Sequence, residues 1–231
     1  MILADGVAMI SLRLGGFVLN PVVLWDEKTA LLVDTGMPGQ VQAIIEALRE
    51  LGVPLERLHT VILTHQDIDH IGSLPELQES VGHQITVCAH EQDQPYIEGE
   101  QPLLKLELPP EMQHFIKHPP RAKVDRLVTD GEYLPWFGGI RILFTPGHTP
   151  GHISLYLQQS KILITGDAMY CENNRLYAPS SRTTPDMPAA LLSIRKFQEY
   201  DITQAVCYHG GVCSNRVNEQ IRLMGTEMNP D

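Results

Sequence analysis

The sequence predicts an α/β protein in which one β-sheet packs on another and helices cover both outer faces. Two halves of the chain follow each other, and each holds several strand-like runs and then an amphipathic helical segment. The 231 residues, 43% of them hydrophobic, are enough to bury a sizeable core. We therefore expect a globular protein of this class.

The first half is expected to begin with short strands and to continue with helices between further strands. Gly15-Gly16 and Asn20-Pro21 separate the first strands, and hydrophobic residues at helical spacing lie between Pro38-Gly39 and Gly52. The predicted elements are strands at 7–12, 17–19, 22–25, 30–33, 60–64 and 84–88, and helices at 41–51 and 73–80.

Residues 91–126 interrupt this alternation. Six prolines punctuate the segment, yet it keeps hydrophobic residues, in which disordered segments are poor. We expect an inserted lid or an association surface within a single domain of residues 1–231. A homodimer stays open as one form of association.

The second half resumes the strand pattern after Arg126. Asp186 is a candidate N-cap for a helix whose hydrophobic residues gather on one side. The predicted elements are strands at 139–144, 153–157, 161–164 and 205–208, and helices at 187–200 and 214–224.

The charge balance and the hydropathy pattern exclude several classes of partner. Lys and Arg number 17 against 28 Asp and Glu, which gives a net charge of −11 without any basic stripe. Nucleic acid and anionic membranes are therefore not expected partners. The N-terminal residues lack a signal-peptide pattern, and no apolar run approaches the roughly 20 residues that span a bilayer, so we expect a cytoplasmic protein. The spacing of the four cysteines is not that of zinc fingers or redox motifs, which predicts reduced, buried thiols.

Potential metal ligands follow four of the predicted strands. Four of them fall within six residues of one loop, and three more stand singly after later strands: His65, Asp67, Asp69 and His70, then His148, Asp167 and His209. Imidazole and carboxylate groups together are the ligand set that a hydrolytic metal centre usually carries. Residues at strand ends are held by a rigid scaffold, which is where folds place their sites.

This ordered set resembles the metallo-β-lactamase superfamily, whose hallmark is His-x-His-x-Asp-His followed by a distant His, Asp and His. The run from Thr145 to His152 and the sequence Thr165-Gly166-Asp167 also match, and the resemblance covers nearly the whole chain. It implies the four-layer αββα sandwich of that superfamily. It further implies two divalent metal ions, the first held by His65, Asp67 and His148, the second by Asp69, His70 and His209, with Asp167 as the bridge.

One residue departs from the superfamily pattern. Asp67 stands where a histidine is usual, and a carboxylate there adds negative charge and a harder ligand. Zinc is the first choice of metal, whereas iron or manganese stays open because diiron members carry an acidic residue at this position. A further alternative is that Asp67 turns away and the first site is loosely filled.

The resemblance implies hydrolysis of a small-molecule substrate by a hydroxide shared between the two ions, with Asp69 both ligating and orienting it. Tyr170 follows Asp167 at the spacing of a tyrosine that donates a hydrogen bond to the developing oxyanion in quorum-quenching lactonases. This match favours an ester or a lactone as substrate, although Tyr170 could instead only pack beside the site. A thioester, as in short glyoxalase II enzymes, and a phosphoester stay open, as does an iron-dependent oxidoreductase.

Four other polar residues are assigned to supporting roles. His152 is expected to brace its own loop by a hydrogen bond, and Asp34 to orient a ligand histidine. His114 and His118 have helical spacing within the insert, where a solvated or packing role is favoured.

Overall fold

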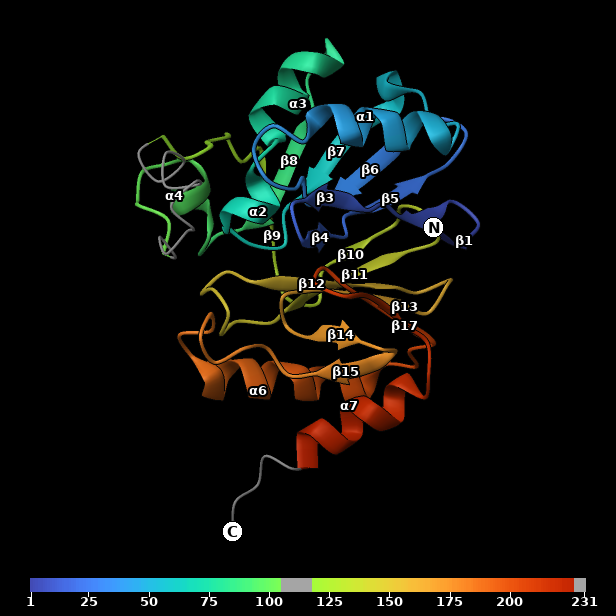
Figure 1. Ribbon diagram of the computed structural model, residues 1–231, viewed down its shortest axis with the longest axis vertical. Coiled ribbons are helices and arrows are strands. Elements are labelled where there is room, and N and C mark those ends of the chain that lie inside the picture. The colour runs from blue at the N-terminus through green and yellow to red at the C-terminus, as the bar shows by residue number, and fades with distance from the viewer. Residues whose placement is uncertain (105–117, 227–231) are drawn as a thin grey trace. The chain divides into compact units, whose positions relative to one another are not determined.

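Two large β-sheets, one in each of two units of the chain, organise the fold (Figure 1). The structure is a computed structural model and describes residues 1–104 and 118–226. The first unit comprises residues 1–12 and 21–127, and the second comprises residues 13–20 and the chain from residue 128 onward.

The sheet of the first unit has seven strands, in the order β1-β2-β5-β6-β7-β8-β9. Its middle strands run parallel, since β6 pairs with β7 and β7 with β8 in the parallel sense. The carboxyl ends of these three strands therefore lie at one edge of the sheet, where α/β folds place their sites. The strands are β1 (Ile2–Ala4), β2 (Val7–Met9), β5 (Val22–Trp25), β6 (Ala30–Val33), β7 (Leu58–Ile62), β8 (Thr86–His90) and β9 (Arg126–Val128).

Helices of the first unit connect the parallel strands. Helix α1 (Val41–Glu50) and the 3₁₀ turn η1 (Leu55–Arg57) join β6 to β7, and α2 (Ile68–Ile71) and α3 (Leu74–Val81) join β7 to β8. Figure 1 shows α1 and α3 on the same face of the sheet. Helix α4 (Gln94–Ile97) follows β8.

The second unit holds a six-stranded sheet in the order β10-β11-β12-β13-β16-β17. Strands β11, β12 and β13 are antiparallel neighbours, and β13 pairs with β16 in parallel, so the carboxyl ends of β11, β13 and β16 share one edge. The strands are β10 (Tyr133–Leu134), β11 (Ile140–Phe144), β12 (Ile153–Leu157), β13 (Ile162–Gly166), β16 (Gln204–Cys207) and β17 (Gly211–Cys213).

Two hairpins and two helices complete the second unit. The hairpins are β3 (Leu12–Leu14) with β4 (Phe17–Leu19), and β14 (Tyr170–Glu172) with β15 (Arg175–Tyr177). Helix α6 (Met187–Lys196) runs into the 3₁₀ turn η3 (Phe197–Glu199), and α7 (Val217–Thr226) closes the described chain. Phe197 is fully buried and lies in a core cluster with Leu163 of β13, Ile194 of α6 and Ile221 of α7.

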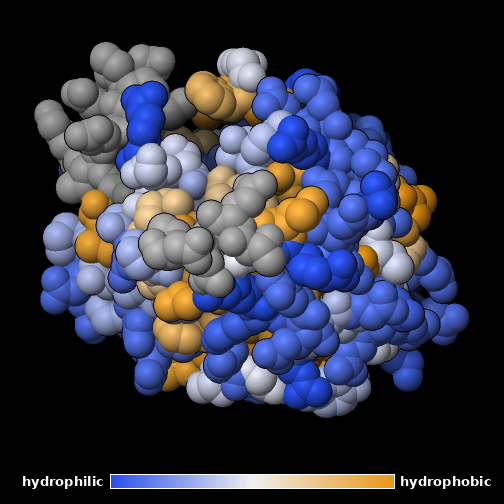
Figure 2. Space-filling view, turned by 90° about the horizontal axis from the view of Figure 1, so that it is seen from below, coloured by the Kyte–Doolittle hydropathy of each residue, from blue (hydrophilic) through white to orange (hydrophobic). Residues whose placement is uncertain are grey.

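The face of the second unit that carries α6 and α7 is mainly hydrophilic (Figure 2). Hydrophobic side chains are scattered over it, and Leu192 of α6 and Leu223 of α7 are among those exposed. Single exposed hydrophobic residues are normal for folded proteins. Both helices thus place one apolar side in the core and a polar side outward, as their periodicity predicts.

Most predicted elements are present, with shifts at their ends. The strand expected at 7–12 is two strands, because Ile10 donates to the carbonyl of Pro21 and the chain then turns into the β3–β4 hairpin. The strand expected at 60–64 ends at Ile62, because the backbone N–H of Thr64 bonds to the side chain of Asp34 instead of a neighbouring strand. Asp186 caps α6 as predicted, accepting from the N–H of Ala189 at 3.0 Å.

Two further sequence predictions concern the thiols and the insert. The four cysteines all lie in the described part of the chain, where none forms a disulfide and all are buried. Within residues 1–104 and 118–226, no helix is both long and apolar enough to cross a bilayer. Residues 105–117 of the predicted insert, and His114 with them, lie outside the described residues, so the lid and the association surface stay predictions.

Candidate metal centre

The ligand loop of the first unit leaves β7 and turns into α2. Asp67 has an extended backbone, with φ −61° and ψ 146°, and its carbonyl accepts from the N–H groups of His70 and Ile71 at the start of the helix. This turn places Oδ2 of Asp67 3.4 Å from Nε2 of His65. Asp67 therefore does not turn away from His65.

Hydrogen bonds to Asp34 and Thr64 fix which ring nitrogen of each histidine carries the proton. The Asp34 carboxylate, which can only accept, lies 2.9 Å from Nδ1 of His70 and 2.8 Å from the hydroxyl of Thr64. Because that hydroxyl donates its one proton to Asp34, it can only accept from Nδ1 of His65, which lies 3.0 Å away. Both histidines thus hold their proton on Nδ1 and present the lone pair of Nε2, the form in which imidazole binds a metal.

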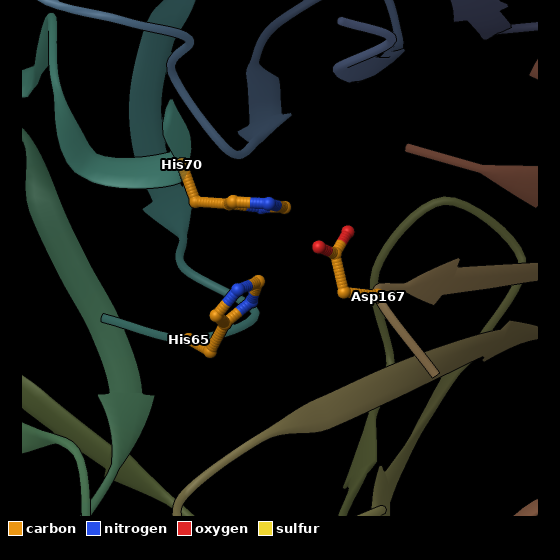
Figure 3. A group of neighbouring side chains, drawn as sticks. All are labelled: His65, His70 and Asp167. Atoms are coloured by element: carbon orange, nitrogen blue, oxygen red, sulfur yellow. The ribbon is translucent and has the colours of Figure 1, made fainter. Parts of the chain in front are cut away.

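His65 and His70 lie together, as Figure 3 shows, with ring centroids 3.9 Å apart and planes tilted by 49°. Both side chains are fully buried. Asp69, one residue before His70 in α2, is a quarter exposed, and its Oδ2 lies 3.8 Å from Nε2 of His70.

Asp93 supports this loop and was not predicted from the sequence. Its buried carboxylate accepts from the backbone N–H of Gln66 at 3.0 Å, so it holds the residue between His65 and Asp67. The amide side chain of Gln66 also accepts from the N–H of Leu104 at 3.0 Å. Asp93 lies three residues beyond β8, and that position at the carboxyl edge of a parallel strand is the signal that could have indicated it.

In the second unit, His148 lies in the loop between β11 and β12, which packs on α6. A Cβ on Gly147, whose φ is 132°, would lie 2.3 Å from the backbone nitrogen of Ala190. Ser193 of α6 also donates to the carbonyl of Pro146 at 2.8 Å. Nδ1 of His148 lies 3.2 Å from the hydroxyl of buried Thr184, and Nε2 lies 3.2 Å from Oδ2 of Asp167.

Asp167 follows β13 and projects from its end (Figure 3). Its backbone N–H donates to Nε2 of His152 at 3.0 Å, so the proton of His152 is on Nδ1 and is donated to the hydroxyl of Thr145 at 2.8 Å. The Thr145 hydroxyl then donates to Ser154, which donates to the carbonyl of Thr165. His152 thus braces its own loop, as the sequence predicts, and also the loop of Asp167, which was not predicted.

His209 follows β16 and is held by its main chain. Its carbonyl accepts from the N–H of Cys171 at 3.1 Å, and it forms a β-bridge with Leu19 of β4. Its Nε2 lies 3.3 Å from Oδ2 of Asp167. The side chain of His209 is 42% exposed, whereas those of His148 and Asp167 are nearly buried.

The chemistry and the spacing of these donors fit divalent metal ions. With metal–ligand bonds of about 2.0–2.1 Å, two donors on a tetrahedral ion lie about 3.3 Å apart. Three nitrogen–oxygen pairs have this spacing within their own units, at 3.4 Å for His65 and Asp67, 3.2 Å for His148 and Asp167, and 3.3 Å for His209 and Asp167. A lone-pair nitrogen and a carboxylate oxygen at such distances repel each other unless a cation or a proton lies between them.

A pocket of about 260 Å³ opens beside the candidate ligands of the second unit. Its lining combines these three residues with apolar and hydroxyl side chains: His148, Asp167, Met169, Tyr170, Pro179, Ser180, Thr183 and His209. Tyr170 reaches it from β14, where its ring stacks on that of Tyr177. Tyr170 therefore both lines the pocket and packs on Tyr177, and its predicted hydrogen bond to an oxyanion stays a prediction.

A sequence model of the metallo-β-lactamase superfamily matches residues 14–209 of this chain. The chain belongs to the metallo-β-lactamase superfamily. Among superfamily relatives it is 30% identical over 204 residues to the probable metallo-hydrolase YflN of Bacillus subtilis, covering 78% of this chain and 75% of that protein. It is 32% identical over 162 residues to the hydroxyacylglutathione hydrolase GloC of Haemophilus influenzae, covering 67% and 68%. The match to the uncharacterized protein YobT of Bacillus subtilis, 33% over 152 residues, spans 66% of this chain and 62% of YobT.

Solved structures of the superfamily confirm the predicted fold class. A metallo-β-lactamase family protein of Thermus thermophilus, TTHA1429, aligns with a TM-score of 0.76 at 23% identity, over 98% of this chain and 80% of that one. The B3 metallo-β-lactamase BLEG-1 aligns with a TM-score of 0.70 at 24% identity, over 96% of each chain. At this level of identity the likeness concerns the fold alone.

The superfamily ligand positions fall into two sets. The first unit supplies His65, Asp67, Asp69 and His70, and the second supplies His148, Asp167 and His209. Asp34 orients His70, as predicted. Two histidines outside this set, His59 and His83, pack their rings on each other, and His118 of the predicted insert is exposed.

Proposed function

We propose that this chain is a metal-dependent hydrolase that cleaves a small-molecule ester or lactone. The observation that carries the proposal is that Oδ2 of Asp167 lies 3.2 Å from Nε2 of His148 and 3.3 Å from Nε2 of His209, on the wall of a pocket. Membership of a superfamily whose relatives include a probable metallo-hydrolase supports the same conclusion.

The proposed centre holds two divalent ions, and zinc is the first choice. His65, Asp67 and His148 would hold the first ion, Asp69, His70 and His209 the second, and Asp167 would bridge them. The orientation of His65 and His70 by Thr64 and Asp34 supports this assignment, because it leaves Nε2 of each ring to face a metal. Such ions lower the pKa of bound water to about 7 and polarise a carbonyl group.

The residues of the chain would contribute positioning and hydrogen bonding. Asp69, partly exposed at the start of α2, would help to hold the second ion and would orient the attacking hydroxide. Tyr170 would donate its hydroxyl proton in a hydrogen bond to the oxygen that becomes negative during attack. Its position on the pocket wall beside His148, Asp167 and His209 supports that role.

The pocket lining favours an uncharged substrate. Met169, Tyr170 and Pro179 are apolar or amphipathic, and Ser180 and Thr183 offer hydroxyl groups. Among the residues that the structure describes, this wall carries no Lys or Arg. An ester or a lactone needs no cationic side chain beside the metal ions, whereas a phosphoester carries a further negative charge that such a side chain would pair. A small molecule is thus the proposed partner, while the predicted homodimer and cytoplasmic location stay predictions from the sequence.

A thioester is the second candidate substrate, and the similarity to GloC is the observation that favours it. The two candidates are separated by assaying the purified zinc-loaded protein against lactones of several ring sizes, aryl esters and a glutathione thioester. We expect turnover of lactones or esters, and its loss in Asp167→Ala and after chelation. Activity on the glutathione thioester, with none on any ester or lactone, would overturn the choice.

Asp67 also motivates a candidate from another class, an iron-dependent oxidoreductase. Elemental analysis of the protein purified without added metal tests it. We expect about two zinc ions per chain; a stoichiometric iron content together with redox activity and no hydrolysis would replace the hydrolase proposal.

A further inference from the structure

The hairpin that carries Tyr170 is built with a defined register. Strands β14 and β15 pair antiparallel with Tyr170 opposite Tyr177 and Cys171 opposite Leu176. Asn173 and Asn174 form the turn with φ values of 51° and 61°, the left-handed pair that suits a tight two-residue hairpin. The register therefore places the two tyrosines directly across from each other.

Alternate residues of the hairpin face opposite ways. Cys171 and Leu176 are buried in the core cluster of the second unit. Tyr170 and Tyr177 belong to the other face, because successive side chains of a strand alternate. That is the face on which Tyr170 lines the pocket with His148, Asp167 and His209.

The backbone of the hairpin is fixed at three points. The N–H of Cys171 donates to the carbonyl of His209, and the N–H of Leu176 donates to Oε1 of Gln220 at 2.8 Å. Gly210 packs so tightly that a Cβ on it would lie 1.7 Å from the carbonyl oxygen of Cys171. Because the backbone is held, rotation of the side chain is the main freedom left to Tyr170.

Tyr177 limits that rotation. Its ring lies nearly parallel to that of Tyr170, at 13°, with centroids 5.0 Å apart. The guanidinium carbon of Arg175 lies 5.2 Å from the centroid of the Tyr177 ring, which restrains Tyr177 in turn. The phenol hydroxyl of Tyr170 is thereby aimed by a stack that belongs to the hairpin itself.

We propose that Tyr177 is a positioning residue that holds the ring of Tyr170 in the orientation from which its hydroxyl reaches the substrate. The inference rests on the proposed function of Tyr170 and adds a residue to it. Tyr177 contributes through the flat face of its ring, so its own hydroxyl is dispensable. A phenylalanine at position 177 should therefore position Tyr170 as well as the tyrosine does, whereas an aliphatic side chain at this position should not.

A double-mutant cycle on ester or lactone hydrolysis tests the proposal. We expect Tyr177→Ala and Tyr177→Leu to lower kcat about 3- to 10-fold with little change in KM. A decrease of about this size corresponds to the energy of one aromatic pair. Tyr177→Phe should retain kcat. In a Tyr170→Phe background, Tyr177→Leu should have no further effect, because the hydroxyl that it aims is gone. An equal loss in both backgrounds would show a merely structural role and would overturn the proposal.

Tyr133 provides a matched control. It is also a tyrosine on a short strand with an arginine over its ring, Arg141 at 5.3 Å, but it does not line the pocket. Tyr133→Leu should leave kcat unchanged. A loss equal to that of Tyr177→Leu would mean that removing any such tyrosine disturbs the protein, and would overturn the specific role of Tyr177.

Side-chain motion of Tyr170 gives a readout that does not depend on activity. In protein with ¹³C-labelled tyrosine, the Tyr170 signals are identified by their absence in Tyr170→Phe. We expect a single χ1 rotamer of Tyr170 in the wild type and in Tyr177→Phe, and averaging between rotamers in Tyr177→Leu. If the motion changes as expected while the wild type cleaves no ester, lactone or thioester, the positioning holds and the proposed function fails. If Tyr170→Phe lowers kcat but Tyr177→Leu changes neither motion nor kcat, the positioning fails and the function holds.

Discussion

The carboxylate of Asp34 accepts a 2.9 Å hydrogen bond from Nδ1 of His70, although the two residues lie 36 positions apart in the chain. Because β6 and β7 are parallel neighbours, Asp34 directly after β6 lies at the same edge as the loop that leaves β7 and leads into α2, which carries His70. Asp34 reaches this position with a left-handed φ of 63°. One carboxylate therefore orients His70 directly and His65 through Thr64.

Replacing Asp34 by asparagine should weaken metal binding without unfolding the protein. Asparagine tolerates a left-handed φ, so Asp34→Asn keeps the backbone while its amide can no longer accept from every donor that now points at it. We expect the zinc affinity to fall about 10- to 100-fold, measured by competition with a chromogenic chelator. Asp5→Asn makes the same change on an exposed turn and should have no effect. An unchanged zinc affinity in Asp34→Asn would contradict the orienting role.

Asp93 should matter for the first unit's ligands although it binds no metal itself. Its carboxylate holds the N–H of Gln66, so Asp93→Ala should let the segment from His65 to Asp67 relax. We expect zinc affinity to fall about tenfold, with a smaller loss in Asp93→Asn, which keeps one oxygen acceptor. Isothermal titration of the metal-free protein measures both, and Glu91→Ala, on an exposed neighbour, is the control. Equal affinities in Asp93→Ala and Glu91→Ala would show that Asp93 does not support the loop.

Thr145 should contribute to stability through the chain of hydrogen bonds around His152. Thr145→Val removes the buried hydroxyl that accepts from His152 and donates to Ser154, and leaves both without that partner. The expected loss is about 1–3 kcal/mol of unfolding free energy, measured by denaturant titration of the metal-free protein. Thr129→Val on the surface should change it by less than about 0.5 kcal/mol. A loss of unfolding free energy no larger than that of Thr129→Val would contradict the hydrogen bonds assigned between His152, Thr145 and Ser154.

The Cys171 thiol should make stability fall at alkaline pH. Burial raises its pKa to about 11, so the folded state keeps the proton after the unfolded chain has lost it. Between roughly pH 9 and 11 the folded state binds more protons, and the unfolding free energy falls as pH rises, by up to about 1.4 kcal/mol per pH unit for one group. Cys171→Ala should lower stability at neutral pH but flatten this decline. Denaturant titrations at pH 7, 9 and 10.5 compare the slopes, and parallel slopes would contradict the prediction.

The close approach of the candidate ligands within each unit could be predicted from the sequence, because they are ionisable residues at the ends of hydrophobic strands. The residues that hold these side chains by hydrogen bonds were only partly predictable. Asp34 directly follows a strand, whereas Asp93 and Thr184 act through hydrogen bonds to residues 27 and 36 positions away. Strands such as β10 and β14 have two or three residues, too few to show a period of two. Their existence depends on tertiary pairing.

The close contact between Gly210 and the carbonyl of Cys171 has a consequence for how this protein can diverge. Any side chain at position 210 would push β14 away. The main chain next to His209 and the strand that carries Tyr170 can therefore change only together during evolution. New substrate preferences are therefore expected to arise where the pocket wall is not tied to a metal ligand. Exposed Ser180 and Thr183 are the lining positions where we expect such mutations, whereas the neighbouring Thr184 contacts His148.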